Sequence, residues 1–236
     1  MSSHESNRNK AIAYLKDIFI AHLSHQDELY NYPRFFLSIR SELVKWIIMI
    51  CQKLRFKKET LYRTISIFDR YVSSSKESST SNDMSKCKLI IITCLSIATK
   101  VNEVNANYLK FFTKNILNFH SNIQYTSSDV YMKECEILSK INYCINSSNI
   151  CQFNSIFEKI CLMFFKNNRS KQKFISINDS MLKEYISSPQ SIEISPVNGA
   201  MKIVNMALNS FKENDVGKAE VIAAIENLTN TNKCIL

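Results

Sequence analysis

The stretch LIIITCLSIATK, residues 89–100, decides the fold of this chain. It is apolar or small on every side, so a helix formed from it has no polar face to turn toward water. A buried β-strand is the alternative, because β-branched residues crowd the first half of the stretch. The apolar pattern continues unbroken over 85–101, however, and is longer than a typical strand. We therefore predict a central helix, surrounded by other helices, whose last turn carries Lys100.

Apolar residues recur with helical spacing on both sides of this stretch. Two polar segments interrupt the pattern, the serine-rich SSSKESSTSND at 73–83, predicted as a loop, and the basic KNNRSKQK at 166–173, predicted as a turn. Ser127 or Ser128 is expected to cap a helix, since a serine oxygen can accept from free N–H groups of a first turn. The predicted helices cover 34–54, 58–75, 85–101, 105–117, 127–142, 147–165, 174–187, 195–211 and 218–229.

Glycine and proline are scarce in this chain, with two and three in 236 residues, which favours helices over hairpins and crossovers. Its two glycines are also too far apart to form one phosphate-binding loop. We expect an all-α chain of two tandem bundles, and we divide it into an N-terminal arm and helix, a first repeat and a second repeat, at 1–33, 34–146 and 147–236. The second repeat has a mostly apolar helix within 193–211 and is one helix short, because a polar tail follows 229.

The net charge of +9 fits either a nucleic-acid-binding surface or a lysine-rich solvated one. Lysines are scattered through every segment, which favours the second interpretation and argues against a nucleic-acid partner. Eight cysteines without a CxxC pair or a signal peptide indicate reduced, buried thiols in an intracellular protein. A zinc site would need ligands from distant segments, because only His22 and His25 of the four histidines lie close together in the chain. No apolar run is long enough to span a bilayer, and the final NKCIL does not fit a prenylation motif, so no membrane partner is expected.

Four blocks of the sequence resemble, in order and spacing, the consecutive helices of a cyclin box. The resemblance implies two tandem cyclin-fold repeats, each around a central apolar helix, with the first cyclin box at 34–146. It also implies a regulatory subunit that binds and activates a cyclin-dependent serine/threonine protein kinase in the nucleus and cytoplasm. Such a subunit performs no chemistry of its own and needs no cofactor, metal or small-molecule substrate. The blocks are IRSELVKWI at 39–47, TLYRTISIFDRYV at 60–72, LIIITCLSIATKVNE at 89–103 and ECEILSKINYCI at 134–145.

The blocks point to more than one branch of the cyclin family. The third block is most similar to cyclin H, and residues 175–203 resemble the transcription-associated cyclins. The first block instead resembles the cell-cycle branch. Both branches, cell-cycle control and transcription control, therefore stay open.

The resemblance assigns a kinase-binding role position by position. In cyclins, a lysine after the central apolar run and a glutamate of the last block form a polar pair, which hydrogen-bonds the start of a mobile kinase helix. These two positions are Lys100 and Glu134 here. The apolar positions around them, where the kinase helix is expected to pack, are Ile97, Val101, Leu138 and Tyr143.

Arg40 and Asp69 match an internal ion pair of the family, whose role is structural. Removing one partner of a partly buried pair is expected to cost about 2 to 4 kcal/mol.

A substrate-docking patch of some cell-cycle cyclins is matched by Ile39, Leu43 and Trp46. Glu42 and Lys88 stand where that patch is apolar and amide-bearing. A carboxylate there resists the desolvation that an apolar anchor demands, so we predict a degenerate patch.

Two other classes of protein remain as alternatives. A TFIIB-like transcription factor also carries two such repeats and binds DNA through a basic surface, although the chain has no N-terminal cysteine-rich zinc ribbon. An enzyme with a cysteine nucleophile would need a nearby base, and His120, in a predicted loop, is the only candidate in the body of the fold.

Overall fold

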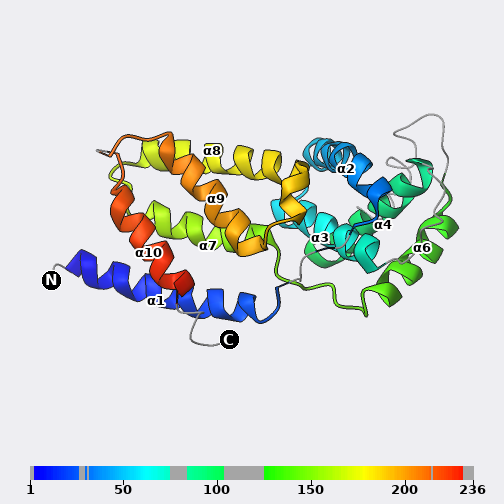
Figure 1. Cartoon of the computed structure of the whole chain (residues 1–236), viewed down its shortest axis with the longest axis horizontal. Coiled ribbons are helices and arrows are strands. Elements are labelled where there is room, and N and C mark those ends of the chain that lie inside the picture. The colour runs from blue at the N-terminus through cyan, green and yellow to red at the C-terminus, as the bar shows by residue number, and fades with distance from the viewer. Residues whose placement is uncertain are drawn as a thin grey trace. The chain divides into compact units, whose positions relative to one another are not determined.

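The computed structural model describes residues 3–26, 30, 32–74, 84–103, 125–213 and 215–230, and in those ranges the chain is helical without a β-strand (Figure 1). This confirms the predicted all-α class. The predicted helix at 105–117, most of the loop at 73–83, and His120 lie outside the described residues. The elements are α1 Ser3–Leu23, α2 Arg34–Lys53, α3 Lys58–Ser74, α4 Met84–Asn102, α6 Ser127–Lys140, α7 Ile150–Leu162, α8 Asn168–Ser187, the 3-10 turn η1 Pro189–Ile192, α9 Pro196–Asn209 and α10 Lys218–Asn230.

The chain forms two compact units, which we name after their central helices. The α4 unit consists of Leu29–Ser147 together with Ser187–Glu193. The α7 unit consists of Met1–Glu28, Ser148–Ile186 and Ile194–Leu236. The N-terminal helix α1 thus belongs to the same unit as the C-terminal half of the chain.

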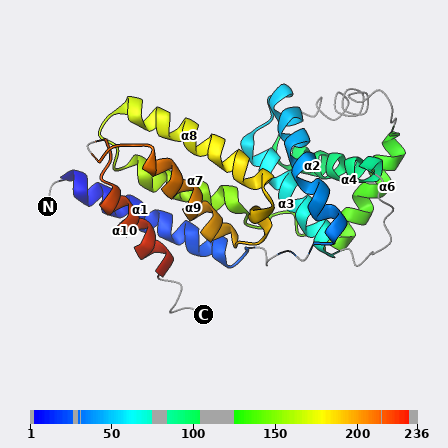
Figure 2. The ribbon, with the colours of Figure 1, turned by 45° about the horizontal axis from the view of Figure 1, so that its top comes forward.

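α4 is the helix predicted from residues 89–100, and it is packed against α2, α3 and α6 (Figure 2). Every residue from Ile90 to Thr99 is buried, as an all-round apolar helix requires. Burial ends at Lys100, which is exposed. The apolar stretch therefore forms the centre of its unit, and its last turn reaches the surface.

The α7 unit is built around α7, which packs against α1, α9 and α10. The sequence pointed to 193–211, the region of α9, as the main apolar helix of this half, but α7 takes the central place. α9 approaches closely because it carries Gly199, where a Cβ atom would lie 2.9 Å from the Cδ1 atom of Ile150 and 3.0 Å from the hydroxyl of Tyr185. Any larger residue at 199 would force these neighbours apart.

Two helices start elsewhere than predicted, and a third has a different cap. α7 begins at Ile150 rather than at 147, after a cap by Asn149. α8 begins at Asn168 rather than at 174, because the side chain of Asn167 accepts a hydrogen bond from the N–H of Ser170 at 2.7 Å. The basic segment predicted as a turn therefore forms the first turns of α8. α6 is capped by Thr126 instead of Ser127 or Ser128, through a reciprocal pair of side chain to backbone bonds between Thr126 and Asp129.

Among the helices that the structure describes, none combines the length and the apolar composition needed to cross a membrane.

Candidate functional site

Lys100 and Glu134, which the sequence placed together, are in contact in the α4 unit. The Nζ atom of Lys100, on the last turn of α4, lies 2.6 Å from each carboxylate oxygen of Glu134 on α6. The lysine side chain is 41% exposed and that of the glutamate 15%. The pair lies at the surface, with the ammonium group accessible from outside.

α6 is held in place by its own cap and by a second carboxylate. The capping bonds from the hydroxyl and N–H of Thr126 keep the pKa of Asp129 below its usual value. Glu136 accepts hydrogen bonds from the hydroxyl of Tyr71 on α3 and, at 2.5 Å, from Lys133. Burial raises the pKa of Glu136, but these two hydrogen bonds and the charges of Lys133 and Lys140 outweigh it, and the net shift is downward. The helix that carries Glu134 is thereby tied to α3.

The apolar residues assigned to the kinase surface differ in exposure. Val101 is 47% exposed and Tyr143 70%, and Leu138 is half-buried. Ile97 is only 2% exposed, because it lies one turn earlier on α4 and faces the core. Ile97 can therefore support the surface from beneath, but it does not contribute exposed area in this structure.

Tyr143 is presented by an unusual turn after α6. Asn142 and Tyr143 have φ angles of 51° and 56°, in the left-handed region that costs a non-glycine residue about 1 to 2 kcal/mol. The turn is nevertheless ordered by hydrogen bonds, since the N–H of Tyr143 donates to the carbonyl of Leu138 at 2.8 Å. This backbone pattern ends α6 and leaves the side chain of Tyr143 exposed.

Two exposed apolar side chains on α6 were missed by the sequence reasoning. Tyr131 and Met132 are each 65% exposed. Tyr131 lies three residues before Glu134 and seven before Leu138, so helical periodicity places it on the same face of α6. That spacing was the signal that could have identified Tyr131 from the sequence.

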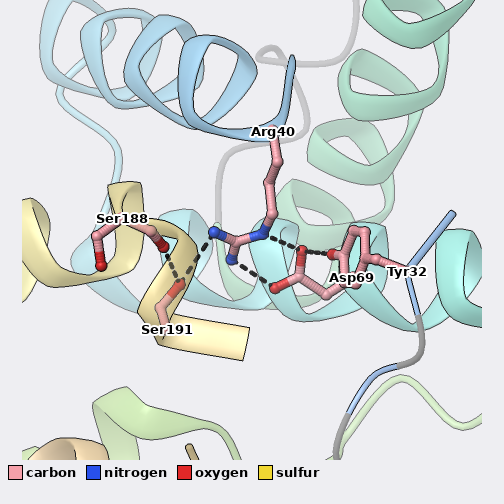
Figure 3. Close-up of polar contacts among 5 residues, drawn as sticks. All are labelled: Tyr32, Arg40, Asp69, Ser188 and Ser191. Atoms are coloured by element: carbon pink, nitrogen blue, oxygen red, sulfur yellow. Dashed lines mark hydrogen bonds and ion pairs between the residues drawn. The ribbon is translucent and has the colours of Figure 1, made fainter. Parts of the chain in front are cut away.

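The predicted ion pair of Arg40 and Asp69 forms at the buried junction of α2 and α3 (Figure 3). The guanidinium binds both carboxylate oxygens, from Nη2 to Oδ2 at 2.8 Å and from Nε to Oδ1 at 3.0 Å. Arg40 is 3% exposed and Asp69 4%. A bidentate pair so fully removed from water serves packing and helix orientation.

Tyr32 and Ser191 complete this network and were not predicted (Figure 3). The hydroxyl of Tyr32 donates to Oδ1 of Asp69, and burial together with the aspartate charge raises the pKa of Tyr32 well above its usual value. The Ser191 hydroxyl accepts from Nη1 of Arg40 at 3.0 Å and donates to the carbonyl of Ser188 at 2.8 Å. Arg40 therefore also holds the η1 segment, which explains why Ser187–Glu193 belongs to the α4 unit.

The residues matched to the substrate-docking patch do not form an open apolar surface. Leu43 is buried at 1% exposure, and Ile39 and Trp46 are half-buried. The Nζ atom of Lys88 lies 5.6 Å from the centre of the Trp46 ring, a distance that allows a cation–π contact. Glu42 is exposed beside them. These positions fit the predicted degenerate patch, which stays a prediction.

The described cysteines are free thiols; most are buried as expected, but Cys135 and Cys144, next to Glu134 and Tyr143 in the chain, are exposed. Burial raises the pKa of the Cys51 thiol, with help from the charge of Glu103, to about 12, and burial also raises the pKa values of Cys94 and Cys161. Thiols with raised pKa values are poor nucleophiles. Within the described ranges, no three His, Cys, Asp or Glu side chains gather closely enough to hold a metal ion.

Comparison with known proteins identifies the family. The family model for the cyclin N-terminal domain matches residues 10–146, which is more than half of the chain. The chain belongs to the cyclin family. It is 24% identical over 201 residues to a G2/mitotic-specific cyclin-B of Patella vulgata, covering 82% of this chain and 44% of that protein. It is 30% identical over 139 residues to the G2/mitotic-specific cyclin-B2 of Bos taurus, covering 55% and 32% respectively.

The fold of this cyclin also matches a solved structure. A viral cyclin from Herpesvirus saimiri superposes with a TM-score of 0.61 at 14% sequence identity, covering 92% of this chain and 96% of the viral one. At that identity the likeness concerns the fold alone. The chain spans less than half the length of the two mitotic cyclins named above.

Proposed function

We propose that this cyclin is the regulatory subunit of a cyclin-dependent serine/threonine protein kinase and binds it through the α4–α6 surface. We define this surface as Lys100, Val101, Glu134, Leu138 and Tyr143. The observation that carries the proposal is the contact of Lys100 with Glu134 at the surface, next in the chain to the exposed side chain of Val101, in a chain of the cyclin family.

The surface has the properties of a site that another protein covers. Val101 and Tyr143 expose apolar area that a partner would remove from water. The ammonium and carboxylate groups of Lys100 and Glu134 can each also bind backbone carbonyl and N–H groups of a partner. The hydrogen bond from the N–H of Tyr143 to the carbonyl of Leu138 fixes the backbone of this turn before the partner arrives, which lowers the backbone entropy lost on binding.

Activation requires that the contacts favour the active conformation of the kinase. A partner shifts an equilibrium only by its difference in affinity for the two states. A preference of about 5.5 kcal/mol moves a two-state kinase from nearly all inactive to nearly all active. ATP, magnesium and the phosphoryl-transfer chemistry belong to the kinase in this proposal, and the cyclin contributes binding energy.

The similarity to mitotic cyclins supports a role in cell-cycle control. A location in the nucleus and cytoplasm remains a prediction. A likeness to cyclin H in the third sequence block remains a prediction, and so does a role in transcription. We propose further that residues 34–146 act as the kinase-binding cyclin box and that residues 147–236 form a second, shorter repeat.

The test is reconstitution with a panel of purified cyclin-dependent kinases. The full chain should co-elute with at least one kinase and raise its rate of phosphate transfer to a peptide. The variant Lys100→Ala with Glu134→Ala should do neither. The matched control is Lys183→Ala with Asp179→Ala, a partly exposed ion pair of 2.6 Å on α8, which should behave as the wild type.

Two results would contradict the proposal. One is a wild-type chain that neither binds nor activates any kinase of the panel. The other is salt-sensitive binding of the wild-type chain to duplex DNA without kinase activation, which would favour the TFIIB-like class.

A further inference from the structure

We infer that Lys57 and Glu103 form a reciprocal cap, which closes the last turn of α4 and positions Lys100 for kinase binding. This inference rests on the proposed function and adds two positioning residues to it. Lys57 directly precedes α3, and Glu103 directly follows α4. Glu103 binds the start of α3, and Lys57 binds the end of α4.

Glu103 caps the start of α3. Its Oε1 atom accepts hydrogen bonds from the N–H of Lys57 at 2.9 Å and from the hydroxyl of Thr60 at 2.6 Å. A carboxylate at a helix N-terminus satisfies donors that have no partner within the helix, and it interacts favourably with the helix dipole. Thr60 is fully buried, so its hydroxyl depends on a partner inside the protein.

Lys57 caps the end of α4 in return. Its Nζ atom donates to the carbonyl of Asn102 at 2.8 Å, which places a positive charge at the negative end of that helix. The N–H of Glu103 donates to the carbonyl of Thr99 at 2.9 Å, so the last turn of α4 stays closed up to Glu103. Two opposite charges therefore fix two helix ends that lie 46 residues apart in the chain.

The turn held in this way carries two residues of the α4–α6 surface. Lys100 and Val101 both lie between Thr99 and Glu103, in the last turn of α4. Helix ends open first when a helix lacks tertiary support. If this turn opened, the backbone of Lys100 would move relative to α6, and the 2.6 Å contact with Glu134 would be lost. The cap thus acts on kinase binding through Lys100.

The first experiment compares three single variants in kinase affinity, measured by calorimetry with a purified kinase that binds the wild type. Glu103→Ala should weaken binding about tenfold at a temperature where the chain is folded, because both acceptor bonds are lost. Glu103→Gln keeps an acceptor oxygen at the same place and should stay within about twofold of the wild type. The matched control Glu59→Ala, in the first turn of α3, should also stay within about twofold, since its carboxylate is exposed there.

A double-mutant cycle then separates positioning from general stability. If Glu103 acts through Lys100, adding Glu103→Ala to Lys100→Ala should weaken binding by less than about twofold, since coupled residues are not additive. Full additivity of the two changes would overturn the inference. So would a Glu103→Ala variant with a lower melting temperature but wild-type affinity, because that is the behaviour of a purely structural residue.

Hydrogen exchange on the free chain tests the cap without a kinase. Glu103→Ala should speed exchange of the amide hydrogens at 101–103 relative to those in the middle of α4, and Glu103→Gln should not. Unchanged exchange in Glu103→Ala would overturn the cap. If the wild type binds no kinase, the proposed function and the positioning role fail together, whereas faster exchange would still show that the cap closes the turn.

Discussion

The two ion pairs of the α4 unit lie in opposite environments. Arg40 and Asp69 are 3% and 4% exposed and share a closed network with Tyr32 and Ser191. The side chain of Lys100 is 41% exposed, and its pair with Glu134 stands at the end of an apolar helix. The buried pair therefore stabilises the fold, whereas the exposed pair leaves its charged groups accessible to a second protein.

The largest effect on stability is expected when the buried pair is broken. Asp69→Ala leaves the guanidinium of Arg40 buried without its carboxylate and should lower the free energy of unfolding by about 3 to 5 kcal/mol. Urea denaturation followed by circular dichroism measures this change. Asp179→Ala, which removes one partner of a partly exposed pair, should cost about 1 kcal/mol or less. Equal losses in the two variants would remove the contrast between buried and exposed pairs.

Tyr32→Phe tests how far the buried network depends on its third donor. Loss of a hydrogen bond to a charged acceptor should cost about 1.5 to 3 kcal/mol in urea denaturation. The raised pKa of Tyr32 also predicts a pH dependence. The folded state keeps the phenol proton while the unfolded chain releases it above pH 10, so stability should fall as the pH rises beyond that value. This alkaline loss should be smaller in Tyr32→Phe, and an identical alkaline slope in both proteins would contradict the assignment.

Ser191→Ala tests whether Arg40 holds the η1 segment. The change removes one acceptor of Arg40 and should cost about 0.5 to 1.5 kcal/mol. Hydrogen exchange should become faster in 188–192 and stay unchanged in α6. Faster exchange spread evenly over the α4 unit would instead indicate a general loss of stability.

The smallest effect on stability is expected at the exposed pair. Lys100→Ala with Glu134→Ala should change the free energy of unfolding by about 1 kcal/mol or less, because water and salt already screen these charges. Thermal unfolding followed by circular dichroism measures it. A loss of stability as large as that of Asp69→Ala would show that the exposed pair is structural and would contradict the difference between the two pairs.

The features that follow a local period could be predicted from the sequence. The apolar run at 89–100 predicted α4. Because this helix has no polar face, the run also predicted the burial of Ile90 to Thr99. The positions of Lys100, Glu134, Arg40 and Asp69 came from the spacing of blocks that resemble a known family. The structure brings each of these pairs into contact.

Contacts between distant segments could not be predicted in this way. Ser191 lies 151 residues from Arg40, and no local pattern connects them. The cap of α3 by Glu103 is likewise a contact between a residue that follows one helix and the start of another. Exposure along an apolar helix was also beyond the sequence, because Ile97 and Val101 share one helical face yet are 2% and 47% exposed. Their exposures differ because the neighbouring helices cover α4 at Ile97 but no longer cover it at Val101.

The central claim is that the exposed pair serves binding while the buried pair serves folding. The most direct test is the dissociation constant between a purified cyclin-dependent kinase and the variant Lys100→Ala with Glu134→Ala, measured by calorimetry beside its melting temperature. We predict binding weaker by about a hundredfold or more, which corresponds to about 2.7 kcal/mol, with a melting temperature close to that of the wild type. Wild-type affinity in that variant would contradict the account.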